Sequence, residues 1–264
     1  MVCQLKKNVI LNNELFKAYN YLFILTSMRT IITQLNRYWD GFLHLLFPST
    51  CLCCDSELHQ SENSCCSICF GELPFTHFEK MEESTPLDEL FYGRVRLTST
   101  FSLMYYEKTS SVKEILHAIK YKNRPDVAIE FGEMIGKRLR DKDRFSSIDL
   151  IIPVPLHQKK KYIRGYNQSE AISKGIQKFI QAPIATNIIH KHEHTKSQTK
   201  LGKFGRWDNV SNQFHVDEKI QQYSHIAIVD DVITTGATLE SIIQSILLIS
   251  PQIQISVISL ALAK

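Results

Sequence analysis

The feature that most constrains the fold of this chain is the stretch from Ile226 to Thr238, which has the sequence IAIVDDVITTGAT. It opens with an apolar run, residues 226–229, of the kind that forms a buried parallel strand. Two adjacent carboxylates and a turn rich in threonine come next. Apolar residues then recur at helical spacing, at Leu239, Ile242, Ile243, Ile246 and Leu247. The order of strand, acidic pair, turn and helix predicts an α/β fold with a ligand site at the carboxyl end of the strand.

The residues of this turn have the chemistry of a site for a phosphorylated sugar. A helix N-terminus presents unpaired N–H groups and the positive end of a dipole, which favour a phosphate. Gly236 lets the backbone come close to a ligand, and the neighbouring threonines offer hydroxyl groups. Carboxylates accept hydrogen bonds and therefore suit sugar hydroxyls. Together these residues predict a cradle for ribose 5-phosphate, made of Asp230, Asp231, Thr234, Thr235, Gly236, Ala237 and Thr238.

The same stretch resembles the binding motif for phosphoribosyl pyrophosphate (PRPP) in type I phosphoribosyltransferases, an apolar strand followed by Asp-Asp-x-x-x-Thr-Gly-x-Thr. A buried strand with a capped helix behind it would explain neither the doubled aspartate nor the three threonines. The resemblance implies a Rossmann-like type I phosphoribosyltransferase fold. It also implies that Asp230 and Asp231 hold the ribose hydroxyls, directly or through Mg²⁺, with PRPP and Mg²⁺ as the expected ligands.

A basic segment follows a second buried strand, residues 148–155, and is therefore expected at the carboxyl end of that strand. Such a segment suits a polyanion, and we expect Arg164, with Lys159, Lys160 and Lys161 contributing, to bind the pyrophosphate of PRPP. A solvated charged loop remains the alternative for the three lysines taken singly.

A long polar connection between residues 190 and 214 carries Lys200 and Arg206. Long loops in compact domains are often functional, and one in this position can close over a substrate and exclude water. We expect Lys200 and Arg206 to complete the neutralisation of the pyrophosphate, which makes them candidate catalytic residues beside Asp230, Asp231 and Arg164.

Six of the seven cysteines lie between residues 51 and 69, which indicates a local metal site in a reducing compartment. Two Cys-x-x-Cys pairs are separated by eleven residues and together supply four thiolates for a tetrahedral Zn²⁺: Cys51 with Cys54, and Cys66 with Cys69. Four thiolates leave no open position, so the zinc is expected to be structural. Cys53 and Cys65 leave the register open, because each lies beside one of the predicted ligands.

Composition and charge narrow the class of protein. The hydrophobic content of 44% is typical of a soluble globular protein. A net charge of +4 suits an anionic ligand but is too mild to predict nucleic-acid binding by itself. No stretch approaches the roughly 20 apolar residues that a membrane span needs. We therefore expect no membrane insertion and a cytoplasmic location.

We expect five segments along the chain: an extension, an amphipathic helix, a zinc ribbon, a linker and a phosphoribosyltransferase-like domain. They are predicted at residues 1–27, 28–47, 48–78, 79–95 and 96–264, respectively. Apolar residues at three- and four-residue steps define the helix. Polar sequence punctuated by proline defines the linker.

The motifs follow one another in a specific order. The cysteine pairs are followed by Lys-Tyr at residue 120, Pro-Val-Pro-Leu-His at 153, Arg-Gly-Tyr-Asn-Gln at 164, Thr-x-Ser-Gln-x-x-Leu at 195, Arg-x-x-Asn at 206 and the acidic motif. Over residues 28–264 this order resembles the ComF family, competence-associated proteins with a double zinc ribbon and a phosphoribosyltransferase-like domain. The common family form of the third of these motifs has Phe where Tyr166 stands.

The resemblance implies two alternative functions. The first is a phosphoribosyltransferase-type protein of DNA uptake and natural competence that binds PRPP or a phosphoribosyl nucleotide. The second is a non-catalytic competence factor that binds single-stranded DNA or proteins of the uptake machinery.

Overall fold

The computed structural model describes residues 49–108, 110–191 and 214–264. The predicted extension and amphipathic helix, and Lys200 and Arg206, lie outside these ranges. The chain divides into two compact units, of which the first contains residues 55–66 and the second contains residues 67–264. The candidate ligand site lies entirely within the second unit.

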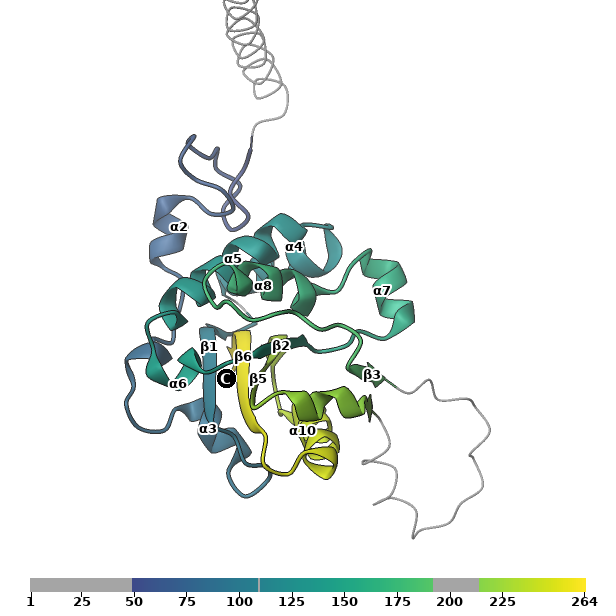
Figure 1. Cartoon of the computed structure of the whole chain (residues 1–264). Helices are drawn as coiled ribbons and strands as arrows, with labels where there is room; N and C mark the ends of the chain where they lie inside the picture. Colours follow the sequence, from purple (N-terminus) through teal and green to yellow (C-terminus); the bar gives the residue numbers. More distant parts are fainter. Residues whose placement is uncertain (1–48, 109, 192–213) are drawn as a thin grey trace, which may run out of the picture. The chain divides into compact units, whose positions relative to one another are not determined.

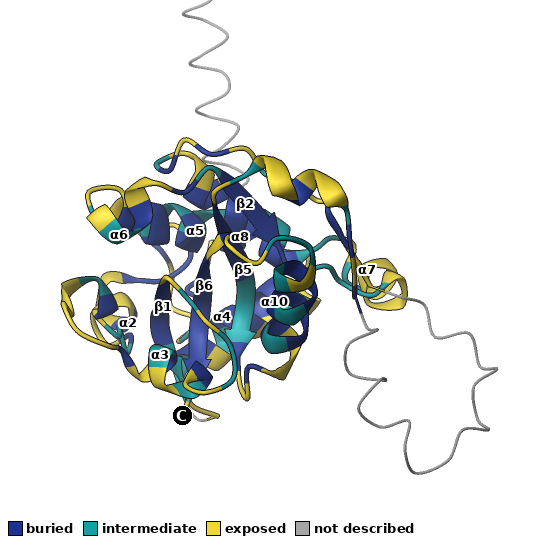
Figure 2. Ribbon diagram, turned by 60° about the horizontal axis from the view of Figure 1, so that its bottom comes forward, coloured by how far each residue is buried: buried dark blue, intermediate teal, exposed yellow. Residues whose placement is uncertain are grey.

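A four-stranded parallel sheet forms the centre of the second unit (Figure 1). Its strands, in spatial order, are β1 (Ser99–Tyr106), β6 (Gln254–Ala263), β5 (His225–Ile233) and β2 (Leu150–Pro153). Most strand residues are buried (Figure 2), as apolar runs in a parallel sheet predict. The predicted α/β fold is confirmed. Because β2 and β5 pair in parallel, their carboxyl ends open onto the same edge of the sheet.

Amphipathic helices cover this sheet. The helices α4 (Ser111–Tyr121), α5 (Pro125–Leu139) and α8 (Gln168–Gln177) lie together on one side, and α10 (Ala237–Ile249) lies on the other (Figures 1 and 2). Helix α8 contacts both β2 and β5, and α5 packs against α8. This packing holds the start of α8 next to the end of β5.

The remaining described elements are short. A two-stranded antiparallel sheet pairs β3 (Ile189–Lys191) with β4 (Phe214–Val216). Short helices of the second unit include α2 (Ser67–Gly71), α6 (Asp143–Ser146), α7 (Gln158–Arg164) and η2 (Glu218–Gln222). Of these, α7 lies next to the candidate site.

The segment 79–95, predicted as a linker, contains the end of η1 (Phe78–Lys80) and the helix α3 (Pro86–Phe91). Thr85 caps α3, since its hydroxyl accepts the Asp88 N–H and its own N–H donates to the Asp88 carboxylate. Phe91 is buried, and α3 packs against β1. Here the polar residues and the proline mark the start of a capped helix instead of a linker.

Candidate functional site

The acidic pair lies at the carboxyl end of β5. Ser169 of α8 donates its hydroxyl to Asp230 Oδ1 at 3.2 Å, and the N–H of Asp231 donates to the same oxygen at 2.8 Å. Lys120 Nζ, from the last turn of α4, lies 3.1 Å from Asp231 Oδ2. Burial and the charge of Asp231 raise the pKa of Asp230 to about 7. The two carboxylates therefore differ, because Asp231 faces a cation whereas Asp230 accepts hydrogen bonds from neutral donors.

The turn after the acidic pair is shaped by Gly236, which precedes α10. Its φ of 72° lies in the left-handed region that favours glycine. A Cβ at this position would lie 2.8 Å from the ring of Phe91, so any larger side chain would displace that ring. The exposed threonines 234, 235 and 238 surround a small cavity of about 50 Å³ at the start of α10. We refer to residues 230–238 as the acid rim.

The basic segment after β2 folds as the short helix α7. Lys160 and Arg164 are four residues apart and therefore lie on the same face of this helix. Lys159 is rotated away from that face, because one residue corresponds to about 100° of helix turn. We refer to residues 157–164 as the basic rim.

The basic rim has little packing behind it. Helix α7 buries none of its residues, and Tyr162 is 91% exposed. Arg164 is the best anchored member, since its Nη1 donates to Gln168 Oε1 at 2.9 Å and its guanidinium lies over the ring of Tyr121 at 5.7 Å. The helix therefore presents its charges largely to solvent.

A cavity of about 230 Å³ opens between the acid rim and the basic rim. Five residues predicted from the sequence line it: Asp230, Asp231, Thr238, Lys160 and Arg164. Four others line the smaller cavity, which shares Asp230 and Thr238 with this one: Thr234, Thr235, Gly236 and Ala237. Lys159 and Lys161 line neither cavity. The structure thus brings the two predicted halves of the site together, with Lys159 and Lys161 left outside.

Three further basic side chains line the cavity although no role was predicted for them: Lys120, His157 and Lys191. Lys120 belongs to the Lys-Tyr motif, and this motif is the feature of the sequence that could have marked Lys120 as a site residue. Nothing in the local spacing indicates that the end of α4 reaches the end of β5, however. That contact depends on the packing of α4 in the tertiary fold.

A larger cavity, of about 500 Å³, is lined by residues of α3 and of the segment that follows it, including Tyr92 and Arg96, and by Arg144 of α6. It contains none of the residues predicted from the sequence. The cavity between the acid rim and the basic rim is the better candidate for ligand binding, because an acidic pair, basic groups and a helix start converge there.

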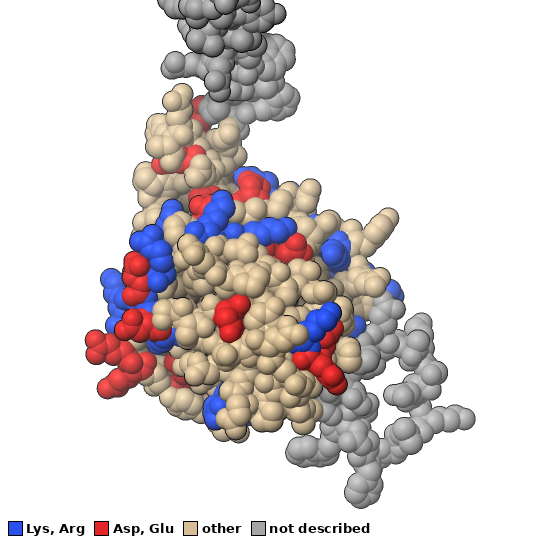
Figure 3. All heavy atoms as spheres, viewed as in Figure 1, with Lys and Arg blue, Asp and Glu red and all other residues tan. Residues whose placement is uncertain are grey.

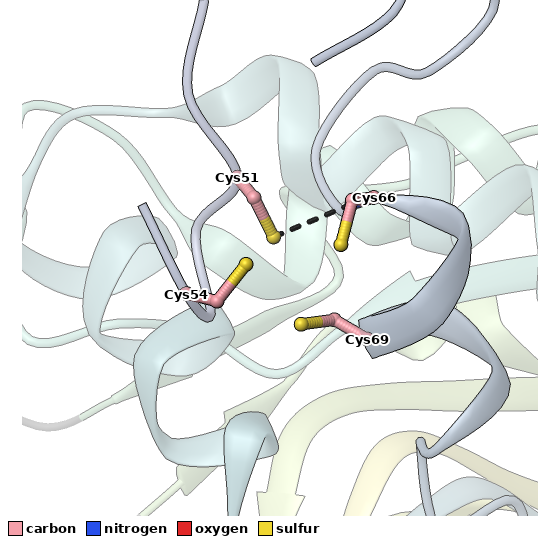
Figure 4. A group of neighbouring side chains, drawn as sticks. All are labelled: Cys51, Cys54, Cys66 and Cys69. Atoms are coloured by element: carbon pink, nitrogen blue, oxygen red, sulfur yellow. Dashed lines mark hydrogen bonds between the residues drawn. The ribbon is translucent and has the colours of Figure 1, made fainter. Parts of the chain in front are cut away.

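Four cysteine side chains lie close together, and in Figure 4 their sulfur atoms face one another. The four sulfur atoms lie within 4.8 Å of one another: those of Cys51, Cys54, Cys66 and Cys69. A tetrahedral zinc with Zn–S bonds of about 2.3 Å separates its sulfur ligands by roughly 3.8 Å, so this donor set fits zinc. Cys53 lies elsewhere, with its Sγ 3.9 Å from the carbonyl oxygen of Ser111. Among the described cysteines the predicted set, including Cys54 and Cys66, is the one that clusters.

Within the described ranges, no helix combines the length and the apolar character needed to cross a membrane. No family model matches the chain. A solved structure of a hypoxanthine phosphoribosyltransferase from Staphylococcus aureus overlaps 60% of this chain and 73% of its own, with 17% identity and a TM-score of 0.28. The α/β fold is established here by the parallel strand order itself.

Curated proteins are more informative. Competence protein F of Haemophilus influenzae is 28% identical over 216 residues, which cover 74% of this chain and 90% of that protein. The DNA utilization protein YhgH of Salmonella typhimurium is 24% identical and covers 77% of this chain and 92% of its own length. The YhgH protein of Escherichia coli O157:H7 is 29% identical, over 50% of this chain and 60% of its own length. The chain is therefore a homologue of competence protein F and of the YhgH proteins, as the order of its motifs predicts.

Proposed function

We propose that this chain binds PRPP together with Mg²⁺ in the cavity between the acid rim and the basic rim. The observation that carries the proposal is the lining of that cavity, which joins Asp230 and Asp231 to Lys160 and Arg164. PRPP has hydroxyls on its ribose and phosphate groups on both sides of it. A cavity with hydrogen-bond acceptors in one part and cations in another is complementary to such a ligand.

Each part of the site has a role in this proposal. The two aspartates accept hydrogen bonds from the ribose hydroxyls, and the threonines and N–H groups of the acid rim bind the 5-phosphate. Arg164 and Lys160 neutralise the pyrophosphate. The carboxylates also suit Mg²⁺, which uses few protein ligands and takes the rest of its oxygens from substrate and water. When bound, Mg²⁺ would neutralise charge on the pyrophosphate.

As a transferase, the protein would catalyse displacement of pyrophosphate from the anomeric carbon by a nucleophile. The residues of this chain would then orient the sugar and stabilise the negative charge that develops on the leaving group. Arg164, Lys160 and Lys120 are among the described basic residues that line the cavity with the acidic pair, and they can supply this stabilisation. Lys200 and Arg206 in the long connection are proposed to join them.

Calorimetric titration with PRPP and Mg²⁺ tests this proposal. Wild-type protein should bind PRPP, and the double variant Asp230→Asn/Asp231→Asn should bind it at least about 100-fold more weakly, because both charged acceptors are lost. Phosphorus NMR of PRPP in the presence of amines and bases then asks whether pyrophosphate is released. Wild-type protein that releases no heat with PRPP would exclude the proposed ligand.

A second candidate function is binding of single-stranded DNA in competence, without catalysis. It is favoured by Tyr162, an aromatic side chain that is 91% exposed and follows Lys159, Lys160 and Lys161 on the basic rim. Stacking on an aromatic ring beside cations is a common way to bind single strands. On the face shown in Figure 3, Lys and Arg are interspersed with Asp and Glu. A single strand would therefore contact the basic rim and not a broad basic surface on this face.

This alternative is tested by salt-dependent binding of a labelled single strand. Binding that survives Asp230→Asn/Asp231→Asn but is weakened by Tyr162→Ala would support it. The names of the relatives, competence protein F and DNA utilization protein, fit a role of either function in DNA uptake.

For the N-terminal part of the described chain, we propose a zinc ribbon at residues 48–78 with a structural Zn²⁺ on the four clustered cysteines. A site of four thiolates has no open position for a substrate, so the ion would act in folding. Metal analysis should find one zinc per chain, and chelation should increase hydrogen exchange at residues 50–70 while the parallel sheet keeps its protection. Purified protein without bound zinc would contradict this part of the proposal.

A further inference from the structure

The segment after α3 lies against the loop proposed to hold the 5-phosphate. Arg94 Nη1 donates to the carbonyl oxygen of Thr235 at 2.8 Å and to that of Leu90 at 3.1 Å. Its Nε donates to Glu240 Oε2, in the first turn of α10, at 3.0 Å, and its Nη2 contacts the same oxygen. One guanidinium therefore joins α3, the loop and the beginning of α10.

A second contact in the same place involves Phe91, which is 1% exposed. Its ring carbons are the nearest atoms to the position that a Cβ on Gly236 would take, at 2.8 Å. The guanidinium of Arg94 lies over this ring, with 5.8 Å between Cζ and the ring centroid. The loop is thus supported on one side by an aromatic ring and anchored through its backbone by an arginine.

The geometry of the peptide bond links this anchor to ligand binding. A trans peptide is planar, so the C=O of Thr235 and the N–H of Gly236 point in opposite directions. Holding the carbonyl oxygen on Arg94 therefore turns the N–H of Gly236 away from α3. Arg94 lines neither of the two cavities at the site, so its effect on a ligand would pass through this peptide.

We infer that Arg94 is a positioning residue that orients the Thr235–Gly236 peptide so that its N–H can bind the 5-phosphate. This inference rests on the proposed PRPP site. A simpler explanation is a surface ion pair with Glu240, since the two side chains are 31% and 25% exposed. Such pairs contribute little to stability, and they would not favour one part of the ligand over another.

The test compares the two ends of the ligand by measuring the affinity of ribose 5-phosphate and of pyrophosphate separately. Arg94→Met should weaken the binding of ribose 5-phosphate about 10-fold, which is the effect of losing one oriented donor. It should change the affinity for pyrophosphate less than about 2-fold. Arg94→Lys, which keeps one donor, should recover part of the affinity. Glu240→Gln should have the smaller effect, because it removes the ion pair but leaves the bond to Thr235.

The matched control is Arg138→Met. Arg138 also pairs with a glutamate, Glu79, at 3.3 Å, and this pair is more buried than that of Arg94, with the two side chains 21% and 10% exposed. This variant should leave ribose 5-phosphate binding unchanged whatever it does to the melting temperature. A readout without ligand is the amide resonance of Gly236, which should shift in Arg94→Met and not in Arg138→Met.

The outcomes are separable. Wild type that binds ribose 5-phosphate while Arg94→Met binds it equally well overturns the inference alone. Equal weakening of both ligands overturns it too, because it indicates a general loss of structure. Wild type that binds neither ligand overturns the proposed function and the inference with it.

Discussion

The two rims of the cavity are built in opposite ways. The acid rim continues a central strand of the sheet, is supported by Phe91 and Arg94, and turns at a glycine that no other residue replaces without strain. The basic rim consists of His157 and the seven residues of α7, and none of the helix residues is buried. One side of the site is therefore fixed by packing before any ligand arrives, and the other is held by few contacts.

This difference has a thermodynamic consequence. A preorganised group loses little conformational entropy on binding, whereas exposed lysine and arginine side chains must be ordered by the ligand. Substitutions in the acid rim should therefore change folding stability and ligand affinity together. Substitutions in the basic rim should change affinity alone. The following predictions test this distinction.

The largest effect is expected from Gly236→Ala. A Cβ would lie 2.8 Å from the Phe91 ring, and alanine would have to adopt the positive φ of 72°, so we expect a loss of about 2 kcal/mol of unfolding free energy. Displacement of the loop should weaken the binding of ribose 5-phosphate about 100-fold. Urea denaturation and calorimetry measure the two effects. Gly93→Ala is the stability control, because Gly93 has a φ of 70° but open space around it. Equal stability losses in the two variants would contradict the role of the Phe91 contact.

The next effect is expected from Lys120→Met. The Nζ of Lys120 lies 3.1 Å from Asp231, and both side chains are mostly buried, so its loss leaves a carboxylate without its cation. We expect unfolding free energy to fall by about 1–2 kcal/mol and PRPP affinity to fall about 10-fold. Lys113→Met, on the same helix, is the control, since Lys113 pairs with Glu114 at 3.9 Å on an exposed surface. If the stability of Lys120→Met were unchanged, Lys120 would behave like a residue of the basic rim, whose substitutions are expected to change affinity alone.

A smaller effect is expected within the basic rim. Lys160 lines the cavity and Lys159 does not, although they are adjacent and chemically identical. Lys160→Met should weaken pyrophosphate binding about 5-fold, as for a single exposed charge, with no change in melting temperature. Lys159→Met should bind as the wild type does. Equal weakening by both variants would mean that the helix acts only through its net charge.

The smallest effect concerns the other end of the strand that carries the acid rim. His225 is buried, with ring nitrogens 2.7 Å from Ser147 Oγ and 2.8 Å from Ser256 Oγ. Burial lowers its pKa, and the charge of Asp149 opposes this only in part. Because the folded state binds a proton less readily than the unfolded state, the stability from neutral His225 is present above about pH 6.5 and is lost as the pH falls through the folded pKa.

Between pH 7.5 and pH 5, wild type should therefore lose about 1 kcal/mol more unfolding free energy than His225→Gln. Thermal unfolding over this pH range measures the difference. Identical pH dependence of the two proteins would show that protonation of His225 does not destabilise β5.

Much of the site follows from local sequence. The run from Ile226 to Thr238 specifies a strand, a turn and a helix start, and all three depend on neighbours within a few residues. The same holds for the cysteine pairs, because each Cys-x-x-Cys spacing places two thiolates on one turn. The different orientations of Lys160 and Lys159 would also follow from the sequence if the segment were known to be a helix.

Other features required the tertiary fold. The segment 79–95 has the composition of a linker, yet it supports the acid rim through Phe91 and Arg94. One of its polar residues caps a helix and another anchors the loop after β5. Composition does not distinguish such residues from polar residues that are merely exposed to solvent.

The acidic pair and the turn after it follow from the sequence alone, since periodicity and short spacing report which residues share a strand end, a turn or a helix face. The sequence also predicted the two Cys-x-x-Cys pairs, but their register became certain only with the clustering of the four sulfur atoms. Only the tertiary structure decided that Lys120 faces Asp231, that Arg94 holds the Thr235 carbonyl and that the two rims line one cavity. These contacts join elements that are distant in the chain, and they arise from the order of the strands and the packing of helices on them.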